Sequence, residues 1–144
     1  MSEAKEYLER IRKQDKAIDK KLDELANLNS IVNRITPVMN MAGAAAGGNQ
    51  DKLGATIAKI VDLQEEINRD VDILVDKKRE AYQILYKLED EIYYKILEMR
   101  YLQYMTFEQI AVELNCSRRW AEIKNGRALE EYDRLLKAVR KNSQ

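Results

Sequence analysis

Two long heptad repeats constrain this chain of 144 residues more than any other feature of its sequence. In the first repeat, from residue 2 to about residue 35, the seam positions alternate between spacings of four and three, which predicts a helix packed lengthwise on another helix. These positions hold Ala4, Leu8, Ile11, Asp15, Ile18, Leu22, Leu25, Asn29 and Val32. At 1.5 Å per residue the helix would be about 50 Å long. It must therefore pack sideways on a partner.

The two ends of this first helix have recognisable signals. Ser2 has a side chain that can accept a hydrogen bond from a free amide of the first turn, so we expect it to be the N-cap. Thr36 precedes Pro37, and a residue before proline is pushed away from helical backbone angles. The sequence therefore predicts that the helix ends at about residue 35.

A second heptad repeat can supply the partner. Its seam is formed by Leu53, Ile57, Ile60, Gln64, Ile67, Val71, Leu74, Lys78, Ala81, Leu85 and Leu88, with Asp51 able to cap its start. The uncharged stretch 38–50 holds three of the five glycines, so we expect a flexible linker there. Two such helices most simply form an antiparallel hairpin over residues 1–89, although pairing between chains is equally compatible with heptads.

Apolar residues also lie outside the second seam, and they widen its apolar face beyond what one partner helix covers. They are Val61, Leu63, Ile73, Val75, Tyr82 and Ile84. This excess favours an arrangement of three or four helices, and hence a homodimer formed through the hairpin.

Residues 90–144 carry a different pattern, that of short helices joined by tight turns. A helix is predicted over 91–102, and Thr106 followed by Gln109 is a capping box that starts another. Asn115 suits the left-handed backbone of a tight turn, and Ser117 can cap a last helix over 117–139. The fold class is therefore all-α, a long coiled-coil-like hairpin followed by a helix-turn-helix, which is a DNA-binding module.

The start of the last helix is basic. Residues 117–127 hold four basic side chains and one acidic side chain, Glu122. Arg118 and Arg119 lie in the first turn, where a recognition helix presents side chains to base edges in the major groove. Lys124 and Arg127 lie further along, where phosphates are within reach. The remaining candidates are Ser117 and the helix amides for a phosphate, and Trp120 for either a sugar-phosphate edge or the core.

The same residues carry a resemblance. Arg100-Tyr101-Leu102, Met105-Thr106-Phe107-Glu108-Gln109-Ile110-Ala111 with Leu114-Asn115 and Ser117, and Arg127-Ala128-Leu129 resemble region 4 of bacterial sigma-70-type factors. The whole chain resembles small phage and prophage regulators of Gram-positive hosts, of the RinA and ArpU type. The resemblance implies activation of phage late, packaging or lysis genes together with host RNA polymerase. It also implies that Arg118, Arg119 and Ile123 face bases, and that Trp120, Glu122 and Arg127 lie near the DNA backbone.

Composition excludes several function classes. The chain has no histidine and a single cysteine, Cys116, so neither a Cys/His zinc site nor a Ser-His-Asp mechanism is possible within it. We expect no enzyme, no cofactor, no metal and no membrane contact, and a cytoplasmic location in a bacterial host. Asp62, Glu66 and Asp70 lie one turn apart and could hold Mg²⁺, but a solvated helix face explains them better.

The charges are balanced, with 25 basic and 25 acidic residues, but they are unevenly distributed. Residues 51–100 carry −3 and residues 101–144 carry +2. Because phosphate contacts by basic residues dominate affinity for DNA, a single copy should bind DNA modestly and in a salt-sensitive manner. Two alternatives therefore stay open: a phage DNA-packaging subunit of the small-terminase type, and a protein that binds RNA polymerase or sigma factor without binding DNA alone.

Overall fold

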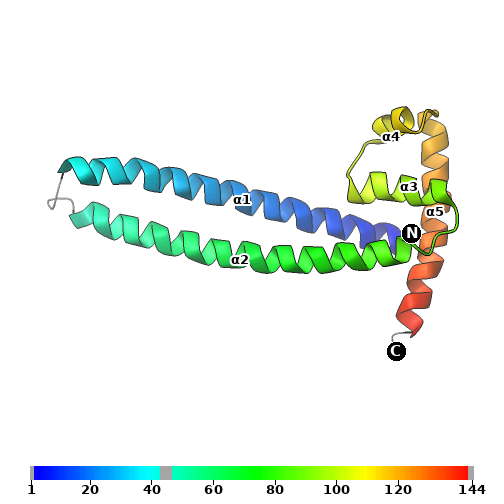
Figure 1. Cartoon of the computed structure of the whole chain (residues 1–144), viewed down its shortest axis with the longest axis horizontal. Helices are drawn as coiled ribbons and strands as arrows, with labels where there is room; N and C mark the ends of the chain where they lie inside the picture. The colour runs from blue at the N-terminus through cyan, green and yellow to red at the C-terminus, as the bar shows by residue number, and fades with distance from the viewer. Residues whose placement is uncertain (1, 43–46, 143–144) are drawn as a thin grey trace. The chain divides into compact units, whose positions relative to one another are not determined.

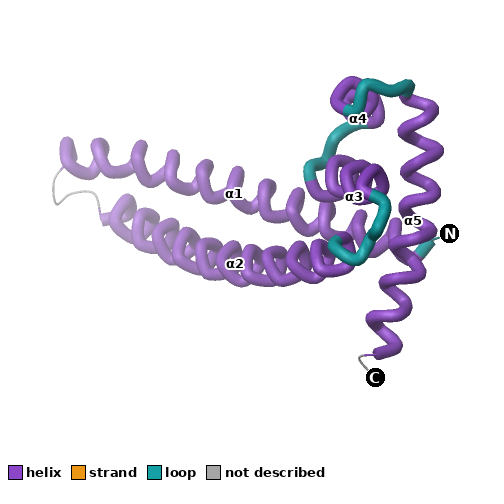
Figure 2. The backbone as a smooth tube through the Cα atoms, turned by 45° about the vertical axis from the view of Figure 1, so that its right-hand side comes forward, coloured by secondary structure: helices purple, strands orange, loops and turns teal. Residues whose placement is uncertain are grey.

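The structure, a computed structural model, describes residues 2–42 and 47–142. Over these residues all regular secondary structure is helical, with no strand (Figure 2), and the predicted all-α fold class is confirmed. The elements are α1 (Glu3–Ala42), α2 (Gly47–Leu85), α3 (Glu91–Leu97), the π-helical segment η2 (Glu98–Leu102), α4 (Phe107–Glu113) and α5 (Arg118–Asn142).

Contacts divide the chain into two compact units. The first unit comprises residues 1–14 and 74–144, and the second comprises residues 15–73. Both α1 and α2 therefore contribute to both units. The domain boundary that the sequence predicts between residues 89 and 90 stays a prediction.

In the second unit, the segments of α1 and α2 lie side by side and run in opposite directions (Figures 1 and 2). Lys21 of α1 forms ion pairs with Glu66, at 2.7 Å between Nζ and Oε1, and with Asp70 of α2. These contacts raise the pKa of Lys21, the hydrogen bond to Asp70 being the largest cause. Ile18, Ile60 and Ile67 are buried, as expected of seam positions.

Alternate seam positions in this unit differ from the prediction. Ile57 and Val71 are exposed, as are Leu22 and Gln64, whereas Thr56 and Leu63 are buried. Burying Leu63 instead of Gln64 removes more apolar surface from water. The hydroxyl of Thr56 donates a hydrogen bond to the Lys52 carbonyl at 2.7 Å, which satisfies it inside the contact. The buried face of α2 therefore lies one residue earlier at these positions.

The predicted helix end at residue 35 and the linker over 38–50 are also wrong in part. Helix α1 continues through Pro37 to Ala42, and α2 begins at Gly47, so residues 38–42 and 47–50 are helical. The rest of the predicted linker, residues 43–46, lies outside the described residues. A proline removes its own amide donor but leaves the donors of the following residues intact, so a helix can continue past it.

The first unit is built around α5. The amide of Ala4 in α1 donates to the Asp133 carboxylate at 3.0 Å, and the hydroxyl of Tyr132 donates to the Ala81 carbonyl of α2 at 3.1 Å. The amide of Lys5 donates to the Ser2 side chain, which confirms the predicted N-cap. The largest fully buried side chains are Leu8, Ile11, Ile84, Leu85, Ile96, Leu97, Ile110, Tyr132 and Leu136. Residues from both ends of the sequence thus share one core.

The helix predicted over 91–102 is an α-helix in its first part and a π-helix in its last part. Asp90 caps α3 by accepting hydrogen bonds from the amides of Ile92 and Tyr93, and the last five residues form η2, in which the amide of Gln103 donates to the Glu98 carbonyl at 2.9 Å. The wider turn allows the adjacent side chains of Tyr101 and Leu102 both to be buried.

Candidate nucleic-acid interface

Helix α4 is fixed by its own sequence. The Gln109 amide donates to the Thr106 hydroxyl at 3.2 Å, while the Thr106 amide donates to the Gln109 side chain at 2.9 Å. This reciprocal pair is the predicted capping box, which is confirmed. The Arg100 guanidinium lies 4.3 Å from the Phe107 ring centroid and donates to the Met105 carbonyl, so the start of α4 is tied to η2.

The turn between α4 and α5 is short and left-handed at one residue. Asn115 has a φ of 54°, as its predicted role requires, and the amide of Cys116 donates to the Ala111 carbonyl at 2.9 Å. Cys116 is half-buried and packs against the local core. The Ser117 side chain then accepts a hydrogen bond from the Trp120 amide at 3.0 Å, which confirms it as the cap of α5.

One face of α5 is buried against α3, η2 and α4. Ala121 is fully buried with Ile96 and Ile110, and its small side chain permits the close approach of the helices. One turn later, Asn125 is buried and its side-chain amide donates to the Tyr101 hydroxyl at 3.1 Å. Because Ala121, Asn125 and Ala128 face inward at helical spacing, the residues between them face outward.

The candidate residues lie on the outward side of α5. Arg118, Arg119, Glu122, Ile123 and Arg127 are exposed, as are Ser117 and Trp120, while Lys124 is half-buried. Thus the fold collects the predicted residues on one accessible surface. We call it the α5 surface, comprising Ser117, Arg118, Arg119, Trp120, Glu122, Ile123, Lys124, Gly126 and Arg127.

Arg118 is already paired in the free protein. Its Nη1 lies 2.5 Å from Oε1 of Glu108 in α4, and its Nε donates to Oε1 of Glu122 at 2.8 Å. The hydrogen bond that Arg118 donates to Glu122 and the charge of Glu108 raise the pKa of Arg118. The pKa of Glu108 is lowered by the backbone amide of its own residue and then by the charge of Arg118, which outweigh the opposing effect of desolvation.

Trp120 and Lys124 form a second pair, one turn apart. The Lys124 ammonium lies 5.5 Å from the centroid of the Trp120 ring, which is a cation–π distance. The ring is 36% exposed, so it does not fill the core, which was one of its two predicted roles. Ile123 is 45% exposed and offers an apolar group beside these charges.

Two residues at this surface were not among the predicted site residues: Glu108 of α4, which pairs with Arg118, and Gly126 of α5. Glu108 was assigned only to the pattern of α4, because nothing in its local sequence indicates that it meets Arg118, ten residues later. Gly126 is exposed, and a Cβ added there would meet nothing within 4 Å. A glycine in the middle of a helix on an otherwise basic surface is a signal for a close approach by another molecule.

The sequence also suggested, as the less favoured interpretation, a Mg²⁺ site at Asp62, Glu66 and Asp70. Glu66 and Asp70 pair with Lys21, and over residues 2–42 and 47–142 no group of three His, Cys, Asp or Glu side chains converges as a metal site would require. Over the same residues, every helix lacks an apolar stretch of the length and charge content that a membrane span needs.

Comparison with known proteins identifies a family. Residues 34–132 match the family described as Protein of unknown function (DUF1492). No curated protein and no solved structure matches the chain. The matched range includes α2, α3, η2, α4 and the first part of α5, and hence the whole α5 surface.

Proposed function

We propose that this chain, which belongs to the DUF1492 family, is a sequence-specific DNA-binding regulator of transcription. The observation that carries the proposal is the α5 surface, a basic first turn on the outward side of a helix that is held by a capped shorter helix and a tight turn. This arrangement supports the predicted helix-turn-helix, a module whose second helix enters the major groove.

The exposed residues suit distinct contacts. Arg119 is exposed, and its guanidinium can grip guanine with two hydrogen bonds. Ile123 is positioned one turn later, where its apolar side chain can meet a thymine methyl group. Arg127 lies one further turn along the same side and suits a phosphate. Base reading therefore rests mainly on Arg119 and Ile123.

The other members of the surface have supporting roles. Ser117 and the first amides of α5 suit a phosphate, as does Lys124, which leans on the Trp120 ring. Arg118 reaches bases only when it leaves Glu108 and Glu122. Glu122 itself tolerates DNA where it accepts a hydrogen bond from cytosine. No residue of the chain is assigned a catalytic role.

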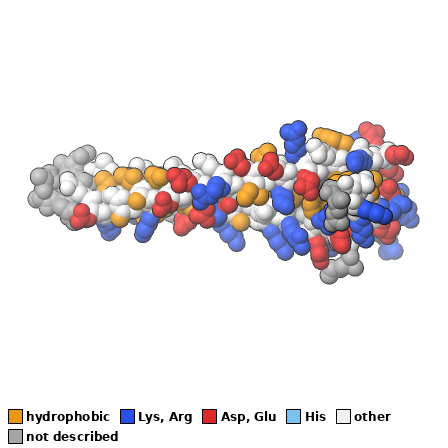
Figure 3. Space-filling view, turned by 90° about the horizontal axis from the view of Figure 1, so that it is seen from below, with side chains coloured by type: hydrophobic (Ala, Val, Ile, Leu, Met, Phe, Trp, Pro, Cys, Tyr) orange, Lys and Arg blue, Asp and Glu red, His pale blue; other side chains and the backbone are white. Residues whose placement is uncertain are grey.

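Homodimerisation is part of the proposal. Ile57, Val61 and Val71 of α2 are each exposed and, by helical periodicity, form an apolar row beside the face that contacts α1. Figure 3 shows hydrophobic side chains at the surface between charged ones. Covering this row with the same row of a second copy would remove apolar surface from water and double the DNA contacts.

Sedimentation velocity tests the proposed dimer separately from DNA binding. Replacing Val61 and Val71 together by Glu should shift the protein from dimer to monomer in sedimentation velocity, because burying two carboxylates in an apolar contact is costly. Ala55→Glu introduces the same charge on another exposed side of α2 and should leave the dimer intact. A wild-type protein that sediments as a monomer at micromolar concentration would refute this part.

The DNA proposal is tested by selecting bound duplexes from a random pool. We expect enrichment of one motif, as two half-sites separated by whole helical turns. Arg119→Ala should weaken binding to that motif by about 10–100-fold, the range for losing one bidentate base contact. Lys141→Ala, an exposed change at the far end of α5, is the matched control. Failure to enrich any sequence would remove the proposal.

One observation favours a second function. Val112 of α4 is 82% exposed, so it is accessible to a protein partner such as RNA polymerase or sigma factor. A Val112→Ser variant that binds its DNA normally but fails to activate a reporter would support activation through polymerase, the role that the resemblance to phage late-gene regulators implies. A wild-type protein that binds DNA but is inactive in the reporter would instead favour a packaging subunit.

A further inference from the structure

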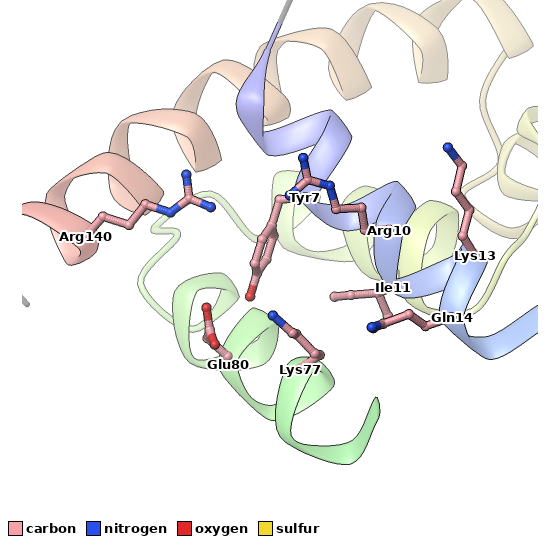
Figure 4. A pocket seen from close by; sticks show the side chains of 8 residues that line it. All are labelled: Tyr7, Arg10, Ile11, Lys13, Gln14, Lys77, Glu80 and Arg140. Carbon is pink, nitrogen blue, oxygen red and sulfur yellow. The ribbon is translucent and has the colours of Figure 1, made fainter. Parts of the chain in front are cut away.

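A pocket of about 300 Å³ lies in the first unit, among the first turns of α1, the last turns of α2 and the end of α5 (Figure 4). Its charged and aromatic lining is formed by Tyr7, Arg10, Lys13, Lys77, Glu80 and Arg140. The volume is at the lower end of the range for small-molecule sites. The pocket is formed at the opposite end of α5 from the α5 surface.

Tyr7 brings an unsatisfied donor to this pocket. Its side chain is 7% exposed and its ring packs on Tyr132, with 6.4 Å between the centroids. Among the described residues, none forms a well-aligned hydrogen bond with its hydroxyl, and the Glu80 carboxylate is the acceptor that lies near it. Burial and then the charge of nearby Glu80 raise the pKa of Tyr7, so the hydroxyl keeps its proton and can donate. A buried hydroxyl without a partner is costly unless a ligand supplies one.

The lining is strongly basic. Arg10, Lys13, Lys77 and Arg140 are four cations, against the single carboxylate of Glu80. Arg140 is paired with Glu3, at 3.2 Å, but none of the described residues forms an ion pair with Arg10, Lys13 or Lys77. In Figure 4 the Lys77 ammonium points toward the Tyr7 hydroxyl, whereas the Arg10 guanidinium and Lys13 lie away from it. Cations gathered from three helices repel one another unless an anion lies between them.

The geometry points to a binding site for a small phosphate ester that carries hydroxyl groups, such as a sugar phosphate or a nucleotide. Lys77 and the Tyr7 hydroxyl would hold the phosphoryl group, since charge-assisted hydrogen bonds to phosphate are strong, and Arg10 would add positive charge at the rim. Glu80 would repel a bare anion, but it accepts hydrogen bonds from hydroxyl groups on the same ligand. The ligand would thereby connect α1, α2 and the end of α5.

Calorimetric titration of the full chain with three probes tests the site. Ribose 5-phosphate should bind at least about tenfold more tightly than inorganic phosphate, because only the former satisfies Glu80 as well as the cations. Ribose alone should give no heat of binding. Equal affinities for the two phosphates would overturn the role of Glu80, and no binding of ribose 5-phosphate would overturn the site.

Two variants locate the binding. Lys77→Gln and Tyr7→Phe should each weaken ribose 5-phosphate by about tenfold, the loss of one charge-assisted hydrogen bond, while circular dichroism confirms that they fold. Lys87→Gln removes an exposed lysine of the same unit outside the pocket and should bind like the wild type. If both pocket variants bind ribose 5-phosphate as tightly as the wild type, the ligand binds elsewhere and the proposal is overturned.

The phosphoryl group of DNA is another possible source of the same chemistry. We expect Lys77→Gln to bind the selected duplex as tightly as the wild type does. Weakened duplex binding with unchanged ribose 5-phosphate binding would assign the pocket to the DNA backbone and overturn the small-ligand site. The calorimetry contains no DNA, so a failure of the DNA-binding proposal leaves its result interpretable.

Discussion

Arg118, in the first turn of α5, lies 2.5 Å from the Glu108 carboxylate of α4, measured between Nη1 and Oε1. An arginine of the α5 surface is thus partly neutralised by a residue of the preceding helix. Both side chains are well exposed, so the pair contributes little to stability. If the chain binds DNA as proposed, the pair matters for binding, because Glu108 competes with DNA for the Arg118 guanidinium.

Removing that competing carboxylate should strengthen DNA binding. Glu108→Gln frees Arg118 from one partner and takes a negative charge away from the interface, so we expect the affinity for the selected duplex to rise by about 2–10-fold at low salt. Fluorescence anisotropy measures it. Glu113→Gln changes an exposed carboxylate at the other end of α4 and is the control. Weaker binding by Glu108→Gln would mean that the ion pair orients Arg118 productively.

Replacing Gly126 by alanine should stabilise the free protein but weaken its binding to DNA. A Cβ at this position meets nothing within 4 Å, so Gly126→Ala should stabilise the free protein by about 0.5–1 kcal/mol through helix propensity. If α5 lies in the major groove, the added methyl group should weaken DNA binding by about tenfold or more.

Gly54 provides the matched control, because it also lies in a helix and has open space around its Cβ. Gly54→Ala should give a similar gain in urea denaturation and no change in affinity for DNA. Equal DNA affinity of both variants would place Gly126 outside the contact surface.

The contact of Asp133 with Ala4 predicts acid sensitivity. Burial alone would raise the pKa of Asp133, but hydrogen bonds from Lys137 and from the amides of Ala4 and Glu3 lower it on balance. Because the pKa in the folded state is lowered, this stabilisation is complete above the pKa of the unfolded chain and is lost as the pH falls through the folded value. Asp133→Asn should therefore cost about 0.5–1 kcal/mol at pH 7 and nothing near pH 2.

Urea denaturation at pH 7, 5, 3 and 2 measures this difference. Asp76→Asn replaces an exposed carboxylate of α2 and serves as the reference. A constant difference between Asp133→Asn and the wild type at all four pH values would contradict the assignment.

The hydrogen bond between Tyr132 and Ala81 should be worth a measurable amount. Tyr132 is fully buried and its hydroxyl donates to the Ala81 carbonyl at 3.1 Å. Tyr132→Phe keeps the ring and should lower the free energy of unfolding by about 0.5–1.5 kcal/mol. Tyr86→Phe removes a hydroxyl from a side chain that is 68% exposed and should change it little. An equal effect of the two substitutions would show that the buried bond contributes nothing.

Local signals made α4 and the start of α5 predictable. Thr106, Gln109, Asn115 and Ser117 act through hydrogen bonds and backbone angles within a few residues, and each has the role that its sequence context indicates. The seam of α2 was less predictable, because Ile57 and Thr56 are both compatible with a heptad and only the position of the partner helix decides between them. The helix end predicted just before Pro37 was wrong because a proline, although it disfavours helix locally, need not end a long helix.

In the candidate site, too, some features could be predicted from local sequence and others could not. The placement of Arg119, Ile123 and Arg127 on one outward side follows from helical periodicity and the small inward residue Ala121. The pairing of Arg118 with Glu108 does not, because it depends on how closely two helices approach after the turn. The pocket at Tyr7 joins residues from three helices, and no short stretch of sequence contains it.

The bond from Ala4 to Asp133 and the ion pair from Glu3 to Arg140 join residues 129 and 137 positions apart. During synthesis on the ribosome, the first turn of α1 is therefore made long before its partners in α5, Asp133 and Arg140. For most of translation, Tyr7 lacks the Tyr132 ring on which it later packs. A chain stopped before residue 133 would keep that segment uncovered, which makes it a natural target for chaperones and proteases.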